Sequence, residues 1–241
     1  MESRRTGGQT PPLPCVQWRE LSELRSWARR GLLSLAEGGR GGLRVSLVRL
    51  LPPPVLLSSR DGHVSLVREL KAALGSPPGA LVLAVGGGGL LAGVSAGLAE
   101  VGWQHVPIVA METRGAHCFN AAVEAGRLVT LPSITSVAKC LGAKTVAARA
   151  LACTQELRIL SEVVEDSEAV TAVQRFLDDE RMLVEPACGA ALAAIYSGLL
   201  GKLQAAGRLS PTLASVVVIV CGGNSIDSRE LQELKAQLGQ S

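Results

Sequence analysis

Four consecutive glycines, Gly86, Gly87, Gly88 and Gly89, constrain the fold of this chain more than any other feature of its sequence. Residues 80–85 before them are apolar without alternation, which predicts a strand covered on both faces. A helix of small residues is expected to begin at about Leu90. Because glycine has no Cβ, the N–H groups of such a turn can converge on one anion at the positive end of the helix dipole. The stretch therefore predicts a phosphate cradle, with a tight or flexible turn as the alternative.

From about Gly62 onward the sequence alternates between strands and helices. Strands are predicted at residues 80–85, 106–111 and 215–220, and helices at 64–74, 90–101, 116–125, 167–179, 187–205 and 228–238. Such alternation is typical of an α/β fold with a mostly parallel sheet in three layers, which binds ligands at the carboxyl ends of its strands. The glycine turn, Glu112 and Cys221 all follow predicted strands, so we expect them at one edge of the sheet.

The first 61 residues differ from the rest and are predicted to be a poorly ordered extension of a domain that spans residues 62–241. Residues 1–60 hold ten arginines and no lysine, with proline clusters at 11–14 and 52–54. One amphipathic helix is expected at about 17–36. An arginine-rich leader is also compatible with a mitochondrial presequence, but four glutamates weaken that interpretation. We expect a cytoplasmic protein, with a mitochondrial one as the alternative.

Composition disfavours several classes of function. A net charge of +3 and six scattered aromatic residues predict no nucleic-acid surface. The six cysteines form no C-x-x-C pair and do not cluster with histidine at zinc spacing, so they are predicted to be reduced thiols of an intracellular protein. Residues 72–99 carry no charge, but Pro77, Pro78 and the four glycines would break a membrane-spanning helix, so no membrane segment is expected.

A dinucleotide site is a further alternative for the glycine turn. Glu112 lies a little over twenty residues beyond it, where an acid that binds ribose would be placed. The G-x-G-x-x-G spacing would need glycine at Leu91 or Ala92, and a G-x-x-x-x-G-K-[ST] loop is also absent from the sequence. An isolated phosphate, such as that of pyridoxal phosphate, fits a compact tetraglycine turn better.

Five runs of sequence carry a family resemblance: VGGGGLLAGV, AMETRGAHCFNAA, SVAKCLGAKT, LVEPACGAALAAIYSGLL and VVVIVCGGNSI. In this order they resemble the serine dehydratase family of fold-type II pyridoxal-phosphate enzymes, particularly its serine dehydratase-like subgroup, from about residue 62 to 238. The resemblance implies an incomplete large domain with a fold like that of tryptophan synthase β. It also implies a pyridoxal 5′-phosphate-dependent ammonia-lyase that acts on L-serine and L-threonine, and a homodimer.

The resemblance also implies roles for individual residues. Gly86, Gly87, Gly88, Gly89 and Leu90 would hold the cofactor phosphate through backbone N–H groups, and Cys221 would face the pyridine nitrogen as a weakly acidic thiol. A potassium ion would be held by Glu112 and by backbone carbonyls, which are hard ligands. The carbonyls are those of Gly86, Ala116, Leu141 and Ala143.

The chemistry of that family needs a lysine that carries the cofactor and moves the α-proton. In the family it lies in a G-S-F-K-x-R-G-like motif, and no such motif occurs in this sequence. The five lysines, Lys71, Lys139, Lys144, Lys202 and Lys235, fall at positions that the resemblance does not mark as catalytic. We therefore expect no useful activity from this chain alone. The alternatives are a non-catalytic protein that binds the cofactor or pairs with a complete subunit and, less favoured, a nicotinamide-binding module.

Overall fold

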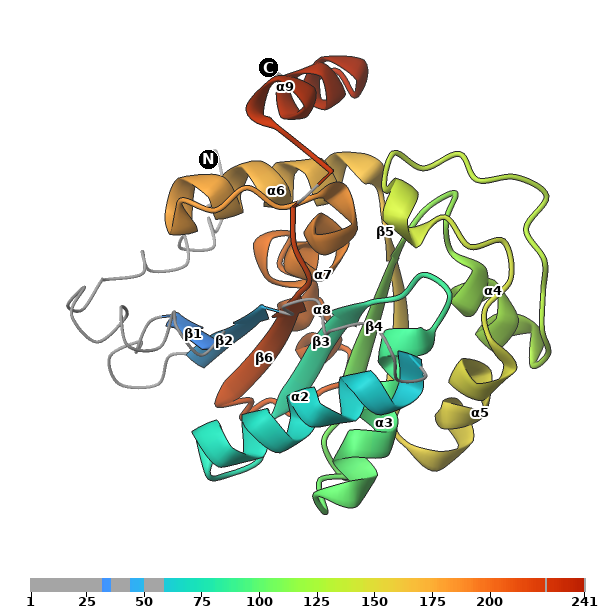
Figure 1. Ribbon diagram of the computed structural model, residues 1–241, viewed down its shortest axis with the longest axis vertical. Coiled ribbons are helices and arrows are strands. Elements are labelled where there is room, and N and C mark those ends of the chain that lie inside the picture. Colours follow the sequence, from blue (N-terminus) through green and yellow to red (C-terminus); the bar gives the residue numbers. More distant parts are fainter. Residues whose placement is uncertain (1–31, 36–43, 50–58, 224, 241) are drawn as a thin grey trace, which may run out of the picture.

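The computed structural model describes residues 32–35, 44–49, 59–223 and 225–240, which build a sheet flanked by helices (Figure 1). The sheet has the order β1-β2-β6-β3-β4-β5. All neighbouring strands are parallel except β1, which runs antiparallel to β2 at one edge. The strands are β1 (Leu32–Leu35), β2 (Arg44–Arg49), β3 (Ala80–Ala84), β4 (Ile108–Thr113), β5 (Ile159–Val164) and β6 (Ser215–Val220).

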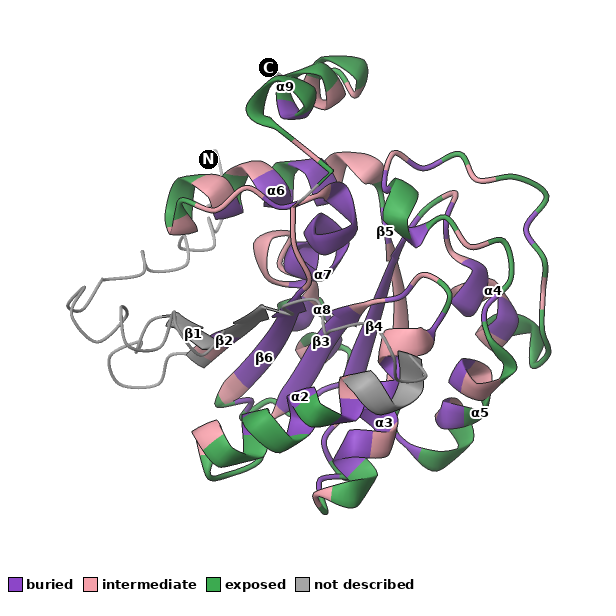
Figure 2. Ribbon diagram, viewed as in Figure 1, coloured by how far each residue is buried: buried purple, intermediate pink, exposed green. Residues whose placement is uncertain are grey.

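The helices lie on both faces of this sheet, so the molecule has the three layers that the sequence predicts (Figures 1 and 2). They are α2 (Ser59–Leu74), α3 (Gly89–Glu100), α4 (Cys118–Ala125), α5 (Ala148–Glu156), α6 (Asp166–Glu180), α7 (Pro186–Tyr196), α8 (Leu199–Ala205) and α9 (Ser228–Gln237), with a short 3-10 helix, η1 (Lys139–Leu141). Among the described residues no single helix has the length and hydropathy to cross a membrane. The α7–α8 pair, bent by 47°, meets those two criteria together.

Side chains of each central strand alternate between two apolar clusters. Ala80 and Val82 of β3 point into the cluster formed with α6 and α7, whereas Leu81 and Leu83 point into the cluster formed with α2 and α3. Figure 2 shows these strands buried along their length. Because β3 is covered on both faces, its sequence is apolar without alternation.

The helix layer of α6 and α7 packs closely. A Cβ added to Gly189 of α7 would lie 2.3 Å from the carbonyl oxygen of Ala169 in α6, a distance that no side chain can occupy. Glycine at this position therefore lets the two helix backbones approach each other. The helix predicted over residues 187–205 is in fact two helices, because the chain turns at Gly198 with φ +72°.

Two strands of the sheet lie within the segment predicted to be a poorly ordered extension. β2 pairs with β6 from Arg44 opposite Ser215 to Arg49 opposite Val220, and β1 pairs with β2. The pairing gives hydrogen-bond partners to the β6 edge, which would otherwise expose unpaired backbone groups. The helix predicted over 17–36 is wrong at β1, and its remainder lies outside the described residues, as does most of the extension. The boundary at residue 61 stays a prediction.

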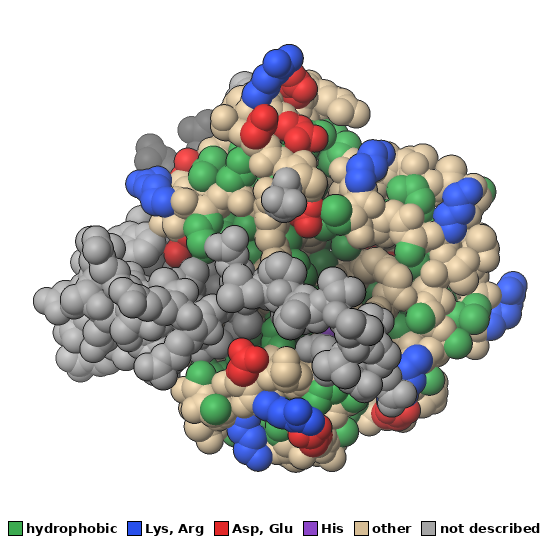
Figure 3. Space-filling view, in the orientation of Figure 1, with side chains coloured by type: hydrophobic (Ala, Val, Ile, Leu, Met, Phe, Trp, Pro, Cys, Tyr) green, Lys and Arg blue, Asp and Glu red, His purple; other side chains and the backbone are tan. Residues whose placement is uncertain are grey.

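On the face shown in Figure 3, acidic and basic side chains of the described residues are interspersed with apolar ones. Five ion pairs join charges of these residues: Arg68–Glu100, Arg114–Glu165, Arg149–Glu156, Arg208–Glu162 and Arg229–Glu233. Glu162, at 16%, has the least exposed side chain of the ten. Ion pairs at the surface contribute about 0–1 kcal/mol each, so apolar burial accounts for far more of the stability than they do.

Candidate functional site

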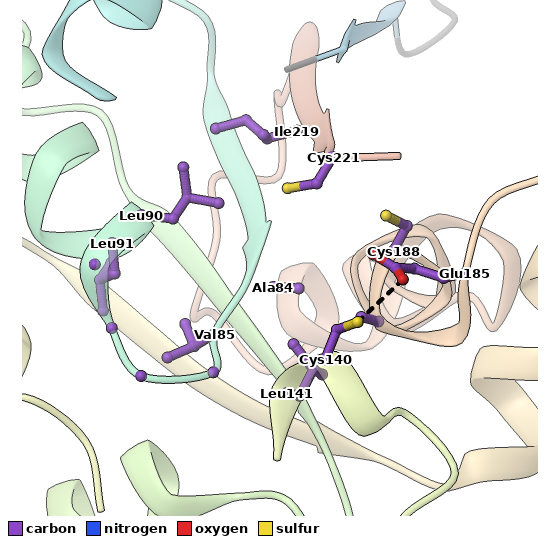
Figure 4. Close-up of a pocket in the computed structure, with 15 residues that line it drawn as sticks. Ala84, Val85, Leu90, Leu91, Cys140, Leu141, Glu185, Cys188, Ile219 and Cys221 are labelled. Atoms are coloured by element: carbon purple, nitrogen blue, oxygen red, sulfur yellow. Dashed lines mark hydrogen bonds between the residues drawn. The ribbon is translucent and has the colours of Figure 1, made fainter. Parts of the chain in front are cut away.

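A cavity of about 240 Å3 lies at the carboxyl ends of β3 and β6 (Figure 4). Its wall comes from the turn after β3 and the start of α3, from η1, from the start of α7, and from the end of β6. The structure therefore brings together segments separated by more than a hundred residues. The lining residues are Ala84, Val85, Gly86, Gly87, Gly88, Gly89, Leu90, Leu91, Cys140, Leu141, Glu185, Ala187, Cys188, Ile219 and Cys221.

The tetraglycine turn forms one wall of this cavity and leads into α3. Gly88 is the N-cap of α3 with φ +90°, and a Cβ there would lie 2.5 Å from the Cβ of Ala150. At Gly87, by contrast, an added Cβ would meet no atom within 4 Å. Within the described part of the chain, the N–H groups of residues 87–90 have no hydrogen-bond acceptor. The turn thus presents free amides at the positive end of a helix, which is the arrangement that favours an anion.

Glu112 is fully buried and lies within β4. The sequence predicts it one residue beyond the end of this strand. Its Oε1 accepts a hydrogen bond from the N–H of Phe119 (2.8 Å), and its Oε2 accepts one from the N–H of Asn120 (2.7 Å). These bonds satisfy two amides at the start of α4. Burial raises the pKa of the carboxyl to about 7, although the two hydrogen bonds act in the opposite direction.

The carbonyl groups that the resemblance assigns to a potassium ion are partly brought together. A Cβ on Gly86 would lie 3.3 Å from the Cα of Leu141, so these two backbones are adjacent. The carbonyl of Gly86 also accepts a long contact from the thiol of Cys118 (3.6 Å). Burial, and after it the Glu112 carboxylate, raises the pKa of that thiol to about 11. Among the described residues, no group of three or more His, Cys, Asp or Glu side chains could hold a metal ion, so a cation here would depend on carbonyl oxygens.

Cys221 is half-buried directly after β6, and it lines the cavity together with Cys188 of α7 (Figure 4). The nearby thiol of Cys188, together with burial, raises the pKa of Cys221 far above its usual range. The thiol of Cys221 therefore keeps its proton at neutral pH.

The sequence analysis did not identify Glu185, which lines the cavity from the N-cap of α7. Its Oε2 accepts hydrogen bonds from the thiol of Cys140 (3.0 Å) and the hydroxyl of Ser225 (2.5 Å). The hydrogen bond to Glu185 is the main reason why the pKa of Cys140 is raised. The Glu-Pro pair was a usable signal, because proline favours the first position of a helix and Glu185 directly precedes Pro186.

None of the five lysines, all of which lie in the described part of the chain, lines the cavity. Lys139 is adjacent to Cys140 in sequence, but its Nζ donates to the carbonyl of Ser136 (2.8 Å). The Nζ atoms of Lys71 and Lys144 likewise donate to the carbonyls of Val101 and Pro132.

Three comparisons with known proteins agree on a family. A family model described as "Pyridoxal-phosphate dependent enzyme" matches residues 58–222. The mouse (Mus musculus) protein named "Serine dehydratase-like" is 80% identical over 179 residues, which are 74% of this chain and 54% of the mouse protein. The human (Homo sapiens) "L-serine dehydratase/L-threonine deaminase" is 61% identical over 179 residues, again 74% of this chain and 55% of that protein.

Two solved structures that are similar to this chain are also those of enzymes named for serine. The crystal structure of a fungal L-serine ammonia-lyase from Rhizomucor miehei matches with a TM-score of 0.69 and 39% identity, over 73% of this chain and 56% of that one. The maize serine racemase structure matches with a TM-score of 0.62 and 25% identity, over 73% of this chain and 53% of that one. The chain spans about half the length of the relatives that it matches.

Proposed function

This chain belongs to the family of pyridoxal-phosphate dependent enzymes, and from that membership we propose that its cavity is the cofactor side of an L-serine and L-threonine ammonia-lyase site. Such a reaction converts L-serine to pyruvate and ammonia, and L-threonine to 2-oxobutyrate and ammonia. The observation that carries the proposal is the tetraglycine turn, whose free amides face a cavity at the start of α3. The printed names of the relatives supply the substrates.

In this proposal the residues of the cavity bind and orient the cofactor. Gly86, Gly87, Gly88, Gly89 and Leu90 donate backbone N–H groups to the phosphate, which the positive end of α3 also attracts. When bound, pyridoxal phosphate supplies an electron sink for the carbanion at the substrate Cα. Cys221 would face the pyridine nitrogen of the bound cofactor as a neutral thiol. A thiol that keeps its proton leaves this nitrogen largely unprotonated, which suits β-elimination better than transamination.

We also propose that a potassium ion binds between Glu112 and the carbonyls of Gly86, Ala116, Leu141 and Ala143. The support is a fully buried carboxyl group that faces no cationic side chain among its hydrogen-bond partners. A charged carboxylate in such surroundings is costly unless a positive charge compensates it. The homodimer and the cytoplasmic location that the resemblance and the composition suggest stay predictions.

A third part of the proposal is that this chain alone does not turn over L-serine. All five of its lysines lie away from the cavity, and a positioned acid–base group contributes about 10²–10⁴-fold to catalysis. The second candidate function follows from the same observation, namely a non-catalytic protein that binds the cofactor or pairs with a complete subunit.

Cofactor binding is tested by titrating the purified chain with pyridoxal phosphate, with Gly87→Ala as the variant. The structure leaves room for this Cβ, so a loss of binding reports on the ligand and not on the fold. The alanine keeps its backbone N–H, but its Cβ would hold the phosphate away from the converging amides. If one hydrogen bond to the charged phosphate is lost in this way, the cost is about 1.5–3 kcal/mol, which raises Kd by about 10- to 100-fold. Gly201→Ala is the matched control, because a Cβ at Gly201 in α8 also meets no atom within 4 Å. If both variants bind the cofactor with equal affinity, the proposal that the tetraglycine turn binds its phosphate is refuted.

Catalysis is tested by measuring pyruvate and ammonia released from L-serine, with potassium and added pyridoxal phosphate. We expect none above background from the chain alone. Replacing residues 1–60 with the amino-terminal segment of an active relative should give turnover, because the cavity residues of this chain are present. Robust turnover by the chain alone, with the cofactor trapped by borohydride on one of its five lysines, would refute the proposed inactivity.

A further inference from the structure

Glu185 is the single charged side chain among the described residues that line the cavity. The family resemblance assigns it no role. In Figure 4 it lies on the side of the cavity opposite Leu90 and Leu91, which belong to the first turn of α3. The cavity therefore has a wall that attracts an anion and, across from it, a carboxylate.

The backbone holds Glu185 in this place. Its N–H donates to the carbonyl of Gly222 (3.1 Å), and its own carbonyl accepts from the N–H groups of Cys188 (2.9 Å) and Gly189 (3.1 Å). Although Glu185 is the N-cap of α7, its side chain accepts no hydrogen bond from the first turn of that helix. The carboxylate is therefore directed to partners outside its own helix.

One oxygen of this carboxylate is satisfied, and the other is free. Oε2 accepts from the thiol of Cys140 (3.0 Å) and from the hydroxyl of Ser225 (2.5 Å). Within the described part of the chain, Oε1 accepts no hydrogen bond, and Glu185 belongs to none of the five ion pairs. Both donors are neutral, so they orient the carboxylate without compensating its charge.

A phosphate in the cradle would add a second negative charge to the same cavity, and a positive group on the ligand would relieve the repulsion. The described residues offer no group of three or more His, Cys, Asp or Glu side chains to a metal ion. A guanidinium is best matched by both oxygens of a carboxylate, but Oε2 already has two donors. An ammonium group needs only one acceptor, which the free Oε1 supplies.

We propose that the cavity prefers a phosphate ester that also carries an ammonium group, with Glu185 as the acceptor for that ammonium. The inference rests on the proposed function, since the tetraglycine turn would hold the phosphate in both. Among forms of the cofactor, the one selected is pyridoxamine 5′-phosphate, which has an ammonium group where pyridoxal phosphate has its aldehyde. None of the five lysines lines the cavity, so none of them supplies this positive charge.

The test compares two ligands of the full chain by isothermal titration calorimetry. The first is pyridoxamine 5′-phosphate, and the second is 4′-deoxypyridoxine 5′-phosphate, which has a methyl group in place of the aminomethyl group. Both keep the pyridine ring and the phosphate, so the ratio of their Kd values reports on the ammonium alone. We expect pyridoxamine phosphate to bind about 10- to 100-fold more tightly, the usual range for a hydrogen bond between charged groups.

Glu185→Gln removes the charge and keeps the size of the side chain. Its amide oxygen can still accept from Cys140 and Ser225, whereas an NH2 group takes the place of the free oxygen. The variant should bind pyridoxamine phosphate about tenfold more weakly than the wild type and should bind the deoxy analogue no more weakly. Glu165→Gln is the matched control, because Glu165 is also the N-cap of a helix, α6, but does not line the cavity. It should keep the wild-type preference.

Equal affinities of the wild type for the two ligands would overturn the inference and leave the proposed function standing. The same holds if Glu185→Gln keeps the preference, or if a variant with the wild-type circular dichroism spectrum loses both ligands equally. If the variant does not fold, the ratio measured on the wild type decides. If the wild type binds neither ligand, the proposed function is refuted together with this inference.

Discussion

Glu112 gives the sharpest quantitative test of the site, because its buried carboxyl links stability to pH. Burial raises its pKa to about 7, from 4.5 in an unstructured chain. The native state then holds the proton more tightly than the unfolded state does. The resulting stabilisation is fully present below pH 4.5 and is lost as the pH rises through about 7. At 1.36 kcal/mol per pKa unit, the loss amounts to about 3 kcal/mol.

The assay is urea unfolding of the chain at a series of pH values between about 4.5 and 8 in tetramethylammonium chloride, a salt whose cation is too large for the site. Wild type should lose about 3 kcal/mol more than Glu112→Gln over this range. The glutamine itself leaves one of the two α4 amides facing its NH2 group, which costs about 1–3 kcal/mol at every pH and so does not affect the slope. Equal slopes for wild type and Glu112→Gln would refute the reasoning about burial.

Potassium separates the cation proposal from simple burial. A bound cation favours the charged carboxylate, so potassium chloride should flatten the wild-type slope and stabilise the chain at pH 8. Saturation at 100 times Kd would add about 2.7 kcal/mol. Glu180 is the matched control, since burial also raises its pKa to about 7 but it lies at the end of α6. Glu180→Gln should reduce the slope and keep the potassium effect. If the free energy of unfolding of the wild type depends on pH equally in both salts, the proposal that Glu112 binds potassium is refuted.

Three further substitutions test the framework around the cavity by thermal or urea unfolding. Gly88→Ala should destabilise by about 1–3 kcal/mol, because φ is +90° and the new Cβ would lie 2.5 Å from that of Ala150; unfolding at the wild-type midpoint would contradict this. Asp166→Asn should cost about 1–2 kcal/mol, since its Oδ1 accepts from the Ser136 hydroxyl at 2.6 Å and Oδ2 from a backbone amide; a neutral effect would show that these bonds do not hold the loop before η1. Gly189→Ala should cost about 1–3 kcal/mol or more by forcing α7 away from α6, and a change below 0.5 kcal/mol, the usual surface value, would refute the close packing.

The strands that sequence predicts best are those with an unbroken apolar run. β6 agrees with the prediction at both ends, since five of its six residues are apolar and buried. β4 begins and ends two residues later than predicted, and its last two residues, Glu112 and Thr113, are polar yet fully buried. Their polarity predicts a loop. They can be buried in the strand because residues in other segments of the chain form hydrogen bonds with them. β5 was missed for a related reason, as Ser161 and Glu162 interrupt an edge strand that is only half covered.

Some residues of the candidate site can likewise be predicted from the sequence, and others cannot. The cradle could be predicted because all its determinants are consecutive in sequence: a buried strand, four glycines and a helix start. Glu185 could not be found by that reasoning, because its contacts come from Cys140 in η1 and Ser225 beyond β6. The spacing of residues within one segment cannot predict contacts between three segments that are far apart in the sequence.

In the structure, the residues proposed for binding lie at the carboxyl ends of the strands, whereas the lysines lie outside the cavity. The order of the parallel sheet sets β3 between β4 and β6. It thereby brings Gly86 and Cys221 to the cavity, while Glu112 lies near the end of the neighbouring strand β4. None of the five lysines lines the cavity, and the Nζ of Lys139 donates to the carbonyl of Ser136. The proposed function thus assigns cofactor binding to this chain and leaves proton transfer to a group that it does not place in the cavity. Cofactor affinity without turnover would identify it as a binding protein, and turnover after addition of an amino-terminal segment from a relative would identify the cavity as half of a lyase site.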